Sequence, residues 1–207
     1  MDEAPILVER RAGYRVLTLN RPERLNAFNE PMHHALAAVI AEAEQDESCR
    51  ALLLTGAGCN IALACDIVLA ARSTNFVQSF ARIGLNPDSG GTWLLPRLVG
   101  QARARGLVLL AEPLPAEKAE AWGLIWKAVD DDALTTEAEK LCAHFASAPS
   151  VGLGLIKRAL DAAANNDLAT QLDLERDLQR EASLTPDYAE GVRAFMEKRK
   201  PVFTGRR

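Results

Sequence analysis

The sequence predicts an α/β body followed by a C-terminal helical region. Short β-prone runs alternate with helical patterns as far as residue 132, whereas only helical periodicity follows from residue 133 onward. In addition, a Gly-Gly turn within residues 83–100 joins a β-prone segment to a helix. We therefore expect two parts, a mixed core over residues 1–132 and a helical region over residues 133–207.

The N-terminal residues are predicted to form a β-β-α-β unit. Two strands, Ile6–Glu9 and Arg15–Leu19, flank a short turn with glycine. A helix begins after Asn29, which is a good N-cap, and its apolar residues recur at helical spacing: Met32, Ala35, Leu36, Val39, Ile40 and Ala43. The apolar run Ala51–Thr55 then suits a buried strand.

The next junction is unusual. Residues 61–71 are apolar enough to form a buried helix, yet only a few residues separate them from the preceding strand. A buried strand followed at once by a buried helix leaves very little chain to cross a layer of the fold.

Residues 83–100, IGLNPDSGGTWLLPRLVG, organise the rest of the core. A β-prone approach over residues 75–80 leads to a turn in which Pro87 fixes φ and two glycines allow backbone angles closed to other residues. Asp88 lies in this turn. On local grounds Asp88, or Ser89 beside it, would cap the following helix, whereas a buried carboxylate facing a pocket could serve as an acid or base.

The remaining elements are mostly helical. In chain order the pattern predicts helices 93–99 and 101–110, a helix beginning at Pro115, strand 125–129, and helices 134–148, 151–164, 168–184 and 188–198. The last helix is opened by Thr185-Pro186.

Composition excludes several function classes. Hydrophobic residues make up 48% and charged residues 25%, and the net charge of −4 gives no electrostatic footprint for nucleic acid. The first residues lack an apolar signal core, and Asp66 interrupts a short apolar run, so we expect no secretion signal and no membrane span. The four cysteines lack CxxC pairing and the three histidines do not complete a metal set. We expect reduced thiols, no metal and a cytoplasmic protein.

Six segments in order resemble the crotonase family, the enoyl-CoA hydratase/isomerase superfamily. They are TLNRPERLNAF, ALLLTGAG, ALACDIVLAA, IGLNPDSGGTWLLPRLVG, AEAWGLIWKAV and EGVRAFMEKRKPVF. The resemblance implies a spiral of ββα units and a C-terminal helical region that forms a homotrimer or a dimer of trimers. It also implies an acyl-CoA thioester substrate, with coenzyme A as part of the substrate and no other cofactor. Two backbone N–H groups, the oxyanion hole, would hold the thioester carbonyl.

The resemblance also identifies a candidate catalytic residue. Hydratases of this family use two glutamates, and the matching positions here are Ile61 and Phe80, neither of which can transfer a proton. Asp88 matches the acidic position used by dienoyl-CoA isomerases and aromatic-acyl-CoA dehalogenases. The resemblance therefore makes Asp88 a catalytic acid or base rather than a helix cap.

Residues that bind coenzyme A are implied in two places. Arg24, Leu25 and Ala27 match a family loop along the adenosine and pantetheine, although a purely structural loop is an equal alternative. Phe195 and Lys198 match a C-terminal position that reaches the phosphates or adenine, often on a neighbouring subunit. The alternative is helix core for Phe195 and a solvated charge for Lys198. The three tryptophans are predicted to lie in the core, without a chemical role.

One family feature is absent from the sequence. Family members have a long insert between TGAG and the CDI helix, and both oxyanion-hole turns lie in it. Neither turn occurs here, so either a few tens of residues between Gly58 and Ile61 are omitted from this sequence or they are truly deleted. We expect omission, because a true deletion would remove a central strand and leave buried backbone groups unpaired. A truly deleted protein should be inactive and poorly folded.

The segments GLNPDSGGTWLLPRLVG, GLGLIK and QLDLERD resemble one branch of the family in particular, the isomerases that act on epoxyphenylacetyl-CoA. The resemblance therefore implies an acyl-CoA isomerase that converts epoxyphenylacetyl-CoA to the ring-expanded oxepin or shifts a double bond in an unsaturated acyl-CoA. Two alternatives remain open. One is an enoyl-CoA hydratase, and the other is a non-catalytic acyl-CoA-binding protein that has kept the fold.

Overall fold

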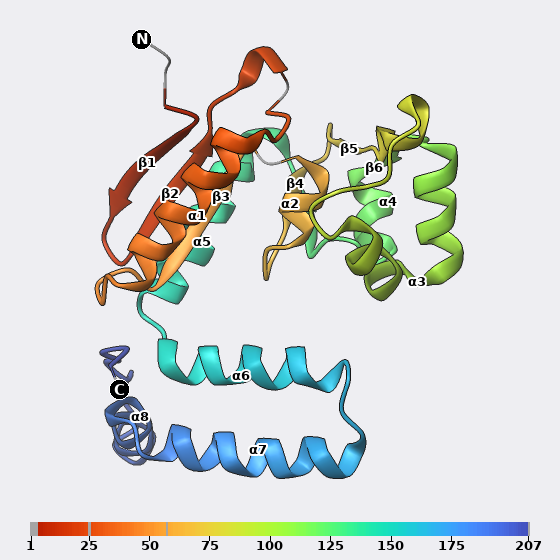
Figure 1. Cartoon of the computed structure of the whole chain (residues 1–207). Helices are drawn as coiled ribbons and strands as arrows, with labels where there is room; N and C mark the ends of the chain where they lie inside the picture. Colours follow the sequence, from red (N-terminus) through yellow and green to blue (C-terminus); the bar gives the residue numbers. More distant parts are fainter. Residues whose placement is uncertain (1–3, 25, 57, 207) are drawn as a thin grey trace. The chain divides into compact units, whose positions relative to one another are not determined.

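The computed structural model describes residues 4–24, 26–56 and 58–206 (Figure 1). Helices and strands alternate up to β7, and only helices follow, as the sequence predicts. In chain order the strands and helices are β1 (Ile6–Arg11), β2 (Tyr14–Leu19), η1 (Pro22–Arg24), α1 (Glu30–Glu44), β3 (Ala51–Thr55), α2 (Cys59–Leu63), β4 (Leu69–Ala71), β5 (Asn75–Phe76), η2 (Ser79–Ile83), α3 (Gly91–Leu110), β6 (Leu114–Pro115), α4 (Ala116–Ala121), β7 (Lys127–Val129), η3 (Asp131–Ala133), α5 (Leu134–Ala146), α6 (Ser150–Ala163), α7 (Leu168–Ser183) and α8 (Pro186–Met196).

The described strands form one three-stranded sheet and two small strand pairs. The larger sheet has the order β1-β2-β3, so β3 lies at its edge. Strand β4 pairs in parallel with β7, with Ala70 opposite Ala128, and β5 pairs antiparallel with β6. The edge position of β3 has a consequence: Leu52 is 40% exposed, so the expectation of a buried strand over residues 51–55 is wrong.

The chain divides into two compact units. Unit 1 comprises residues 1–8, 17–37 and 54–139, and unit 2 comprises residues 9–16, 38–53 and 140–207. The predicted division at residue 133, between a core and an oligomerising helical region, stays a prediction.

Unit 1 is built around an apolar cluster between α3, α4 and the short strands. Leu95, Ala116 and Ala119 are almost completely buried in it. Helix α3 contains the predicted break, because Gly100 has a non-helical backbone with φ 78°. A positive φ is costly for residues with a side chain, and glycine therefore allows the two predicted segments, 93–99 and 101–110, to join.

Unit 2 contains the C-terminal part of α5 and the helices α6 to α8, of which α6 and α7 pack against each other. Thr185 caps α8 as the Thr-Pro sequence predicts, since its hydroxyl accepts a hydrogen bond from the N–H of Tyr188 at 3.2 Å. Arg50 donates to the carbonyl oxygens of Ala146 at 2.9 Å and Phe203 at 3.2 Å, and so ties the C-terminal segment to α5.

Two predicted elements differ from the structure. The helix predicted over residues 61–71 ends at Leu63, and Leu69–Ala71 forms β4 instead. The reason is the parallel pairing with β7, which an apolar run alone does not reveal because buried helices and strands look alike over short lengths. The β-prone segment 75–80 is a strand only at Asn75–Phe76 before the 3₁₀ helix η2 begins.

The additional residues expected between Gly58 and Ile61 are not present in this 207-residue chain. Cys59 and Asn60 follow Gly58 directly and already form the first turn of α2.

Candidate functional site

The turn that carries Asp88 lies between η2 and α3, within unit 1. Three residues in it have positive φ: Gly84 at 71°, Ser89 at 48° and Gly90 at 76°. Ser89 is the notable one, because a residue with a side chain pays a conformational cost in this region. The backbone next to Asp88 is therefore held in a conformation that the surrounding structure has to stabilise.

Asp88 itself does not have the role that local sequence suggested. Helix α3 is capped by Gly90, and no side chain supplies a cap hydrogen bond, so the prediction that Asp88 or Ser89 caps the helix is wrong. The expectation of a buried carboxylate is also wrong, because Asp88 is exposed. Its backbone oxygen accepts a hydrogen bond from the N–H of Gly91 at 2.8 Å, which closes the turn.

A buried polar cluster lies beneath this turn. The Nδ2 of Asn60 donates to the backbone oxygen of Asp88 at 3.0 Å, and the Nε2 of Gln78 donates to the Oδ1 of Asn60 at 2.7 Å. The same Nε2 lies 3.2 Å from the Sγ of Cys59. Burial raises the pKa of the Cys59 thiol to about 11, so this cysteine is a neutral, structural group.

Exposed apolar side chains flank Asp88 along the chain. Ile83 is 71% exposed, Leu85 is 60% exposed and Trp93 is 53% exposed. Such large apolar groups rarely stand in water without a binding or packing role when they gather in one segment. The prediction that all three tryptophans lie in the core is wrong, because Trp93 and Trp126 are both more than half exposed and Trp122 is partly buried.

The loop predicted to contact coenzyme A belongs to the same unit. Arg24 and Ala27 are exposed, and Leu25 lies outside the described residues. Asn26, at φ 54°, fixes the loop: its Oδ1 accepts from the N–H of Arg21 at 2.7 Å and its Nδ2 donates to the oxygen of Gly56 at 3.0 Å. The loop is thus pre-organised, with Arg24 available to an anionic group in solvent.

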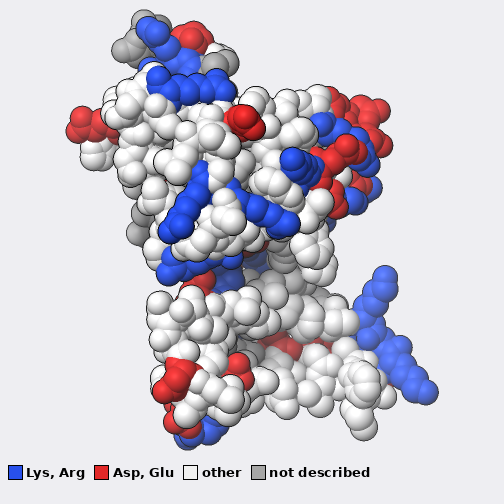
Figure 2. All heavy atoms as spheres, turned by 90° about the vertical axis from the view of Figure 1, so that its right-hand side faces the viewer, with Lys and Arg blue, Asp and Glu red and all other residues white. Residues whose placement is uncertain are grey.

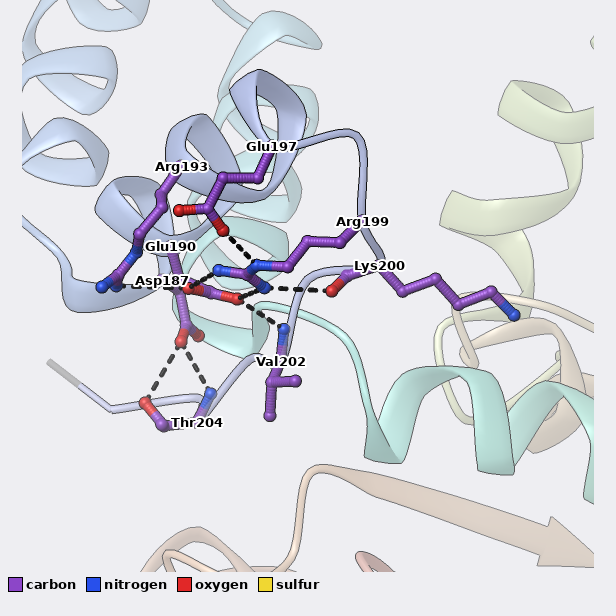
Figure 3. Close-up of polar contacts among 8 residues, drawn as sticks. All are labelled: Asp187, Glu190, Arg193, Glu197, Arg199, Lys200, Val202 and Thr204. Atoms are coloured by element: carbon purple, nitrogen blue, oxygen red, sulfur yellow. Dashed lines mark hydrogen bonds and ion pairs between the residues drawn. The ribbon is translucent and has the colours of Figure 1, made fainter.

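The second predicted contact with coenzyme A lies in unit 2. Phe195 is 82% exposed, so the alternative of helix core is wrong for this residue, and Lys198 is exposed with φ 53°. Just beyond α8, Arg199 donates to both carboxylate oxygens of Glu190, at 2.6 and 3.0 Å (Figure 3). These bonds, with the N–H of Val202 donating at 2.9 Å, hold the pKa of Glu190 down to about 2.

Ion pairing at Glu190 fixes the chain reversal that presents Phe195 and Lys198 to solvent. The structure does not place these two residues relative to unit 1, so it does not bring them together with Asp88. The two positions that replace the hydratase glutamates, Ile61 and Phe80, are both partly buried.

Sequence reasoning missed Asn60 and Gln78. A usable signal existed for Asn60, since it is a polar residue at the start of an otherwise apolar segment, immediately before Ile61. Gln78 gave no such signal, because a single glutamine in a β-prone run is ordinary on a solvated strand face.

Figure 2 shows basic and acidic side chains of both signs scattered over one face, with larger uncharged areas between them. Among the described residues, no helix combines the length and apolar character needed to cross a bilayer.

Comparison with known proteins identifies relatives over nearly the full chain. Two models of the enoyl-CoA hydratase/isomerase family match residues 55–206 and 14–64. A 1,2-epoxyphenylacetyl-CoA isomerase of Escherichia coli K12 is 44% identical, covering 94% of this chain and 96% of its own. A probable enoyl-CoA hydratase of Rhodobacter capsulatus is 39% identical, covering 94% and 95%. The crystal structure of an enoyl-CoA hydratase from Polaromonas sp. JS666 superposes with a TM-score of 0.91 at 25% identity, covering 96% and 99%.

The same comparison reveals an internal difference in length. The Escherichia coli alignment runs over 251 positions, whereas 94% of this 207-residue chain is about 195 residues, so about 56 positions have no counterpart here. The two family matches meet within residues 55–64, around the junction at Gly58 and Cys59. The relatives therefore contain a segment that this chain lacks, and its place is the one that sequence motifs indicated.

Proposed function

We propose that this chain, which belongs to the enoyl-CoA hydratase/isomerase family, is an acyl-CoA isomerase in which Asp88 carries the proton. The observation that carries the proposal is the pair of features at one turn: an exposed carboxylate that caps nothing, flanked by exposed apolar side chains. Such a carboxylate is free to meet a substrate, and the apolar residues suit an acyl group.

The substrate proposed is epoxyphenylacetyl-CoA, the compound named for the relative that is 44% identical. In this scheme the thioester carbonyl is polarised, Asp88 removes a proton from the neighbouring carbon, and the same proton is delivered to a ring carbon as the ring electrons rearrange to the oxepin. The product is an isomer, so no oxidant, reductant or water is consumed. An unsaturated acyl-CoA would follow the same route, with the proton returned two carbons away and the double bond shifted.

We propose that Arg24 and Ala27 border the coenzyme A moiety, with Leu25, and that Phe195 and Lys198 contact it from a neighbouring subunit. The exposed side chains of Arg24, Phe195 and Lys198 support this proposal. Exposed apolar residues on α6 and α7, among them Leu160 at 68% and Leu172 at 54%, support self-association as a trimer or a dimer of trimers. Coenzyme A would be part of the substrate, with no further cofactor. The four cysteines lack CxxC pairing, which supports a reducing, cytoplasmic location.

A specific observation favours a second candidate, a non-catalytic acyl-CoA-binding protein. Family resemblance assigns both oxyanion-hole N–H groups to the segment that this chain lacks. Without two fixed donors, the developing enolate would lose a stabilisation of about 3–4 kcal/mol per donor. Hydration is the third candidate, supported by relatives named as hydratases and opposed by Ile61 and Phe80 at the glutamate positions.

One experiment separates the three candidates. Purified chain is incubated separately with epoxyphenylacetyl-CoA, a 2-enoyl-CoA and a 3-enoyl-CoA, while binding of a non-reactive acyl-CoA is measured by calorimetry. Ring expansion, or movement of the double bond, without addition of water supports the isomerase. Addition of water supports the hydratase, and binding without any reaction supports the non-catalytic protein.

A further inference from the structure

The buried amides beneath the Asp88 turn form a directional chain of hydrogen bonds. Asn60 is 5% exposed and Gln78 is 2% exposed, so both amides are removed from solvent. The backbone oxygen of Asp88 can only accept a hydrogen bond, so Asn60 has to present its NH₂ group there. The Oδ1 of Asn60 then faces Gln78, which in turn has to present its own NH₂ group.

This directionality distinguishes the cluster from ordinary filling of space. Reversing either amide would place two acceptors or two donors against each other, at a cost typical of an unsatisfied buried polar group. One such unfavourable group is already present, because the buried Oε1 of Gln78 has no hydrogen-bond partner among the described residues. In this orientation the Oε1 of Gln78 is unpaired, while its Nε2 donates to Asn60 and Cys59.

Gly91 allows Asn60 to approach the turn. A Cβ atom on Gly91 would lie 2.5 Å from the Nδ2 of Asn60 and 2.7 Å from its Cγ, closer than real Cβ contacts. Both Asn60 and Gly91 also bond the same atom, the backbone oxygen of Asp88, at 3.0 and 2.8 Å. The backbone of Asp88 is thus held from α2 and from the first residue of α3.

We propose that Asn60, held by Gln78, is a positioning residue that fixes the Asp88 turn for proton transfer. This inference rests on the proposed function of Asp88. Asn60 touches the backbone of Asp88 and not its carboxylate, so it acts by orientation. Misplacement of a reacting group by about 1 Å can reduce a rate by about a hundredfold.

The kinetic test compares Asn60→Ala with a matched control, Asn86→Ala. The Nδ2 of Asn86 also donates to a backbone oxygen of this turn, that of Pro87 at 3.0 Å, but Asn86 is exposed. We expect Asn60→Ala to lower kcat by about tenfold to a hundredfold with little change in KM, and Asn86→Ala to leave both near wild type. Equal effects of the two variants, or an unchanged kcat for Asn60→Ala, would overturn the proposal.

A second measurement does not depend on activity. In the wild-type background Gly91→Ala should lower the melting temperature, because its Cβ displaces Asn60. In the Asn60→Ala background the clash is gone, and alanine is a better helix residue than glycine, so the same substitution should leave the melting temperature unchanged or raise it. Additive effects of the two substitutions would contradict the contact on which the proposal depends.

Hydrogen exchange distinguishes failure of this proposal from failure of the proposed function. The amide of Gly91 should exchange slowly in wild type and Asn86→Ala, and faster in Asn60→Ala, because that amide bonds the oxygen that Asn60 holds. If wild type has no isomerase activity but the exchange pattern is found, the proposed function fails while Asn60 still fixes the turn. Unchanged exchange in Asn60→Ala would overturn the positioning role itself.

Discussion

Replacement of Asp88 by asparagine separates a catalytic role from a structural one. Asparagine has nearly the same shape, keeps the backbone oxygen that Asn60 and Gly91 bond, and cannot carry a proton. Since Gly90 caps α3 without side-chain help and Asp88 is exposed, no cap or buried contact is lost. A surface substitution of this kind changes the free energy of unfolding by no more than about 0.5 kcal/mol. For a chain of this length that corresponds to a melting-temperature shift of less than about 2 °C.

The expected effect on activity is far larger. Loss of a general acid or base lowers a rate by about 10²–10⁴-fold, which corresponds to about 3–5 kcal/mol in the activation barrier. The assay follows isomerisation of epoxyphenylacetyl-CoA and of a 3-enoyl-CoA by Asp88→Asn and wild type at equal concentration. Asp132→Asn, another exposed aspartate of unit 1, is the matched control and should retain full activity.

Two results would refute the reasoning. Activity of Asp88→Asn within about threefold of wild type lies outside the range of a lost acid or base, and would remove Asp88 from the mechanism. A loss of activity accompanied by a fall in melting temperature of several degrees would indicate a structural role that the exposed carboxylate does not suggest.

Three further predictions concern unit 2. Asp187, 3% exposed, accepts hydrogen bonds from the N–H of Thr204 at 2.7 Å and of Gly205 at 2.8 Å. In Asp187→Asn the amide NH₂ would face one of these N–H donors, which should lower the free energy of unfolding, measured by urea titration, by about 1–3 kcal/mol. An unchanged free energy of unfolding would contradict these bonds. Hydrogen bonds from Ser48 and Arg15 lower the pKa of Asp46 from 3.8 to about 2. Because the pKa is lower in the folded state, ionised Asp46 stabilises the fold at pH values above the unfolded-state pKa, and this stabilisation is lost as the pH falls from about 4 to about 2. Asp46→Asn should therefore remove this contribution to the pH dependence of the free energy of unfolding. Sedimentation at micromolar concentration should give a trimer or its multiple, and a clean monomer would exclude a coenzyme A site shared between subunits.

Sequence patterns predicted well those elements whose ends are set by local chemistry. The Thr185 cap of α8 and the break at Gly100 depend on a hydroxyl and a missing Cβ, both of which can be recognised in the sequence. The prediction of a helix over residues 61–71 failed because the last three of these residues pair with β7, more than fifty residues later in the chain. Non-local pairing of this kind leaves no periodic signal in a short apolar run.

The candidate site was predictable only in part. Family resemblance indicated Asp88, but the exposure of its carboxylate and the cap at Gly90 required coordinates. Asn60 and Gln78 act through contacts between residues 18 and 28 positions apart, which no local pattern contains. The insert was expected because the glycine motifs of the family are missing from this sequence. The length of the alignment with the Escherichia coli relative agrees that family members contain such a segment, whereas this chain lacks it.

The central claim, that this chain isomerises an acyl-CoA thioester, is tested most directly by identifying the product formed from epoxyphenylacetyl-CoA. Purified chain is incubated with that substrate, and the thioesters are separated by chromatography and their masses measured by mass spectrometry. The account predicts a new species of unchanged mass, the ring-expanded isomer, which forms with wild type and hardly at all with Asp88→Asn. Recovery of the unreacted epoxide, or a product heavier by one water molecule, would contradict it.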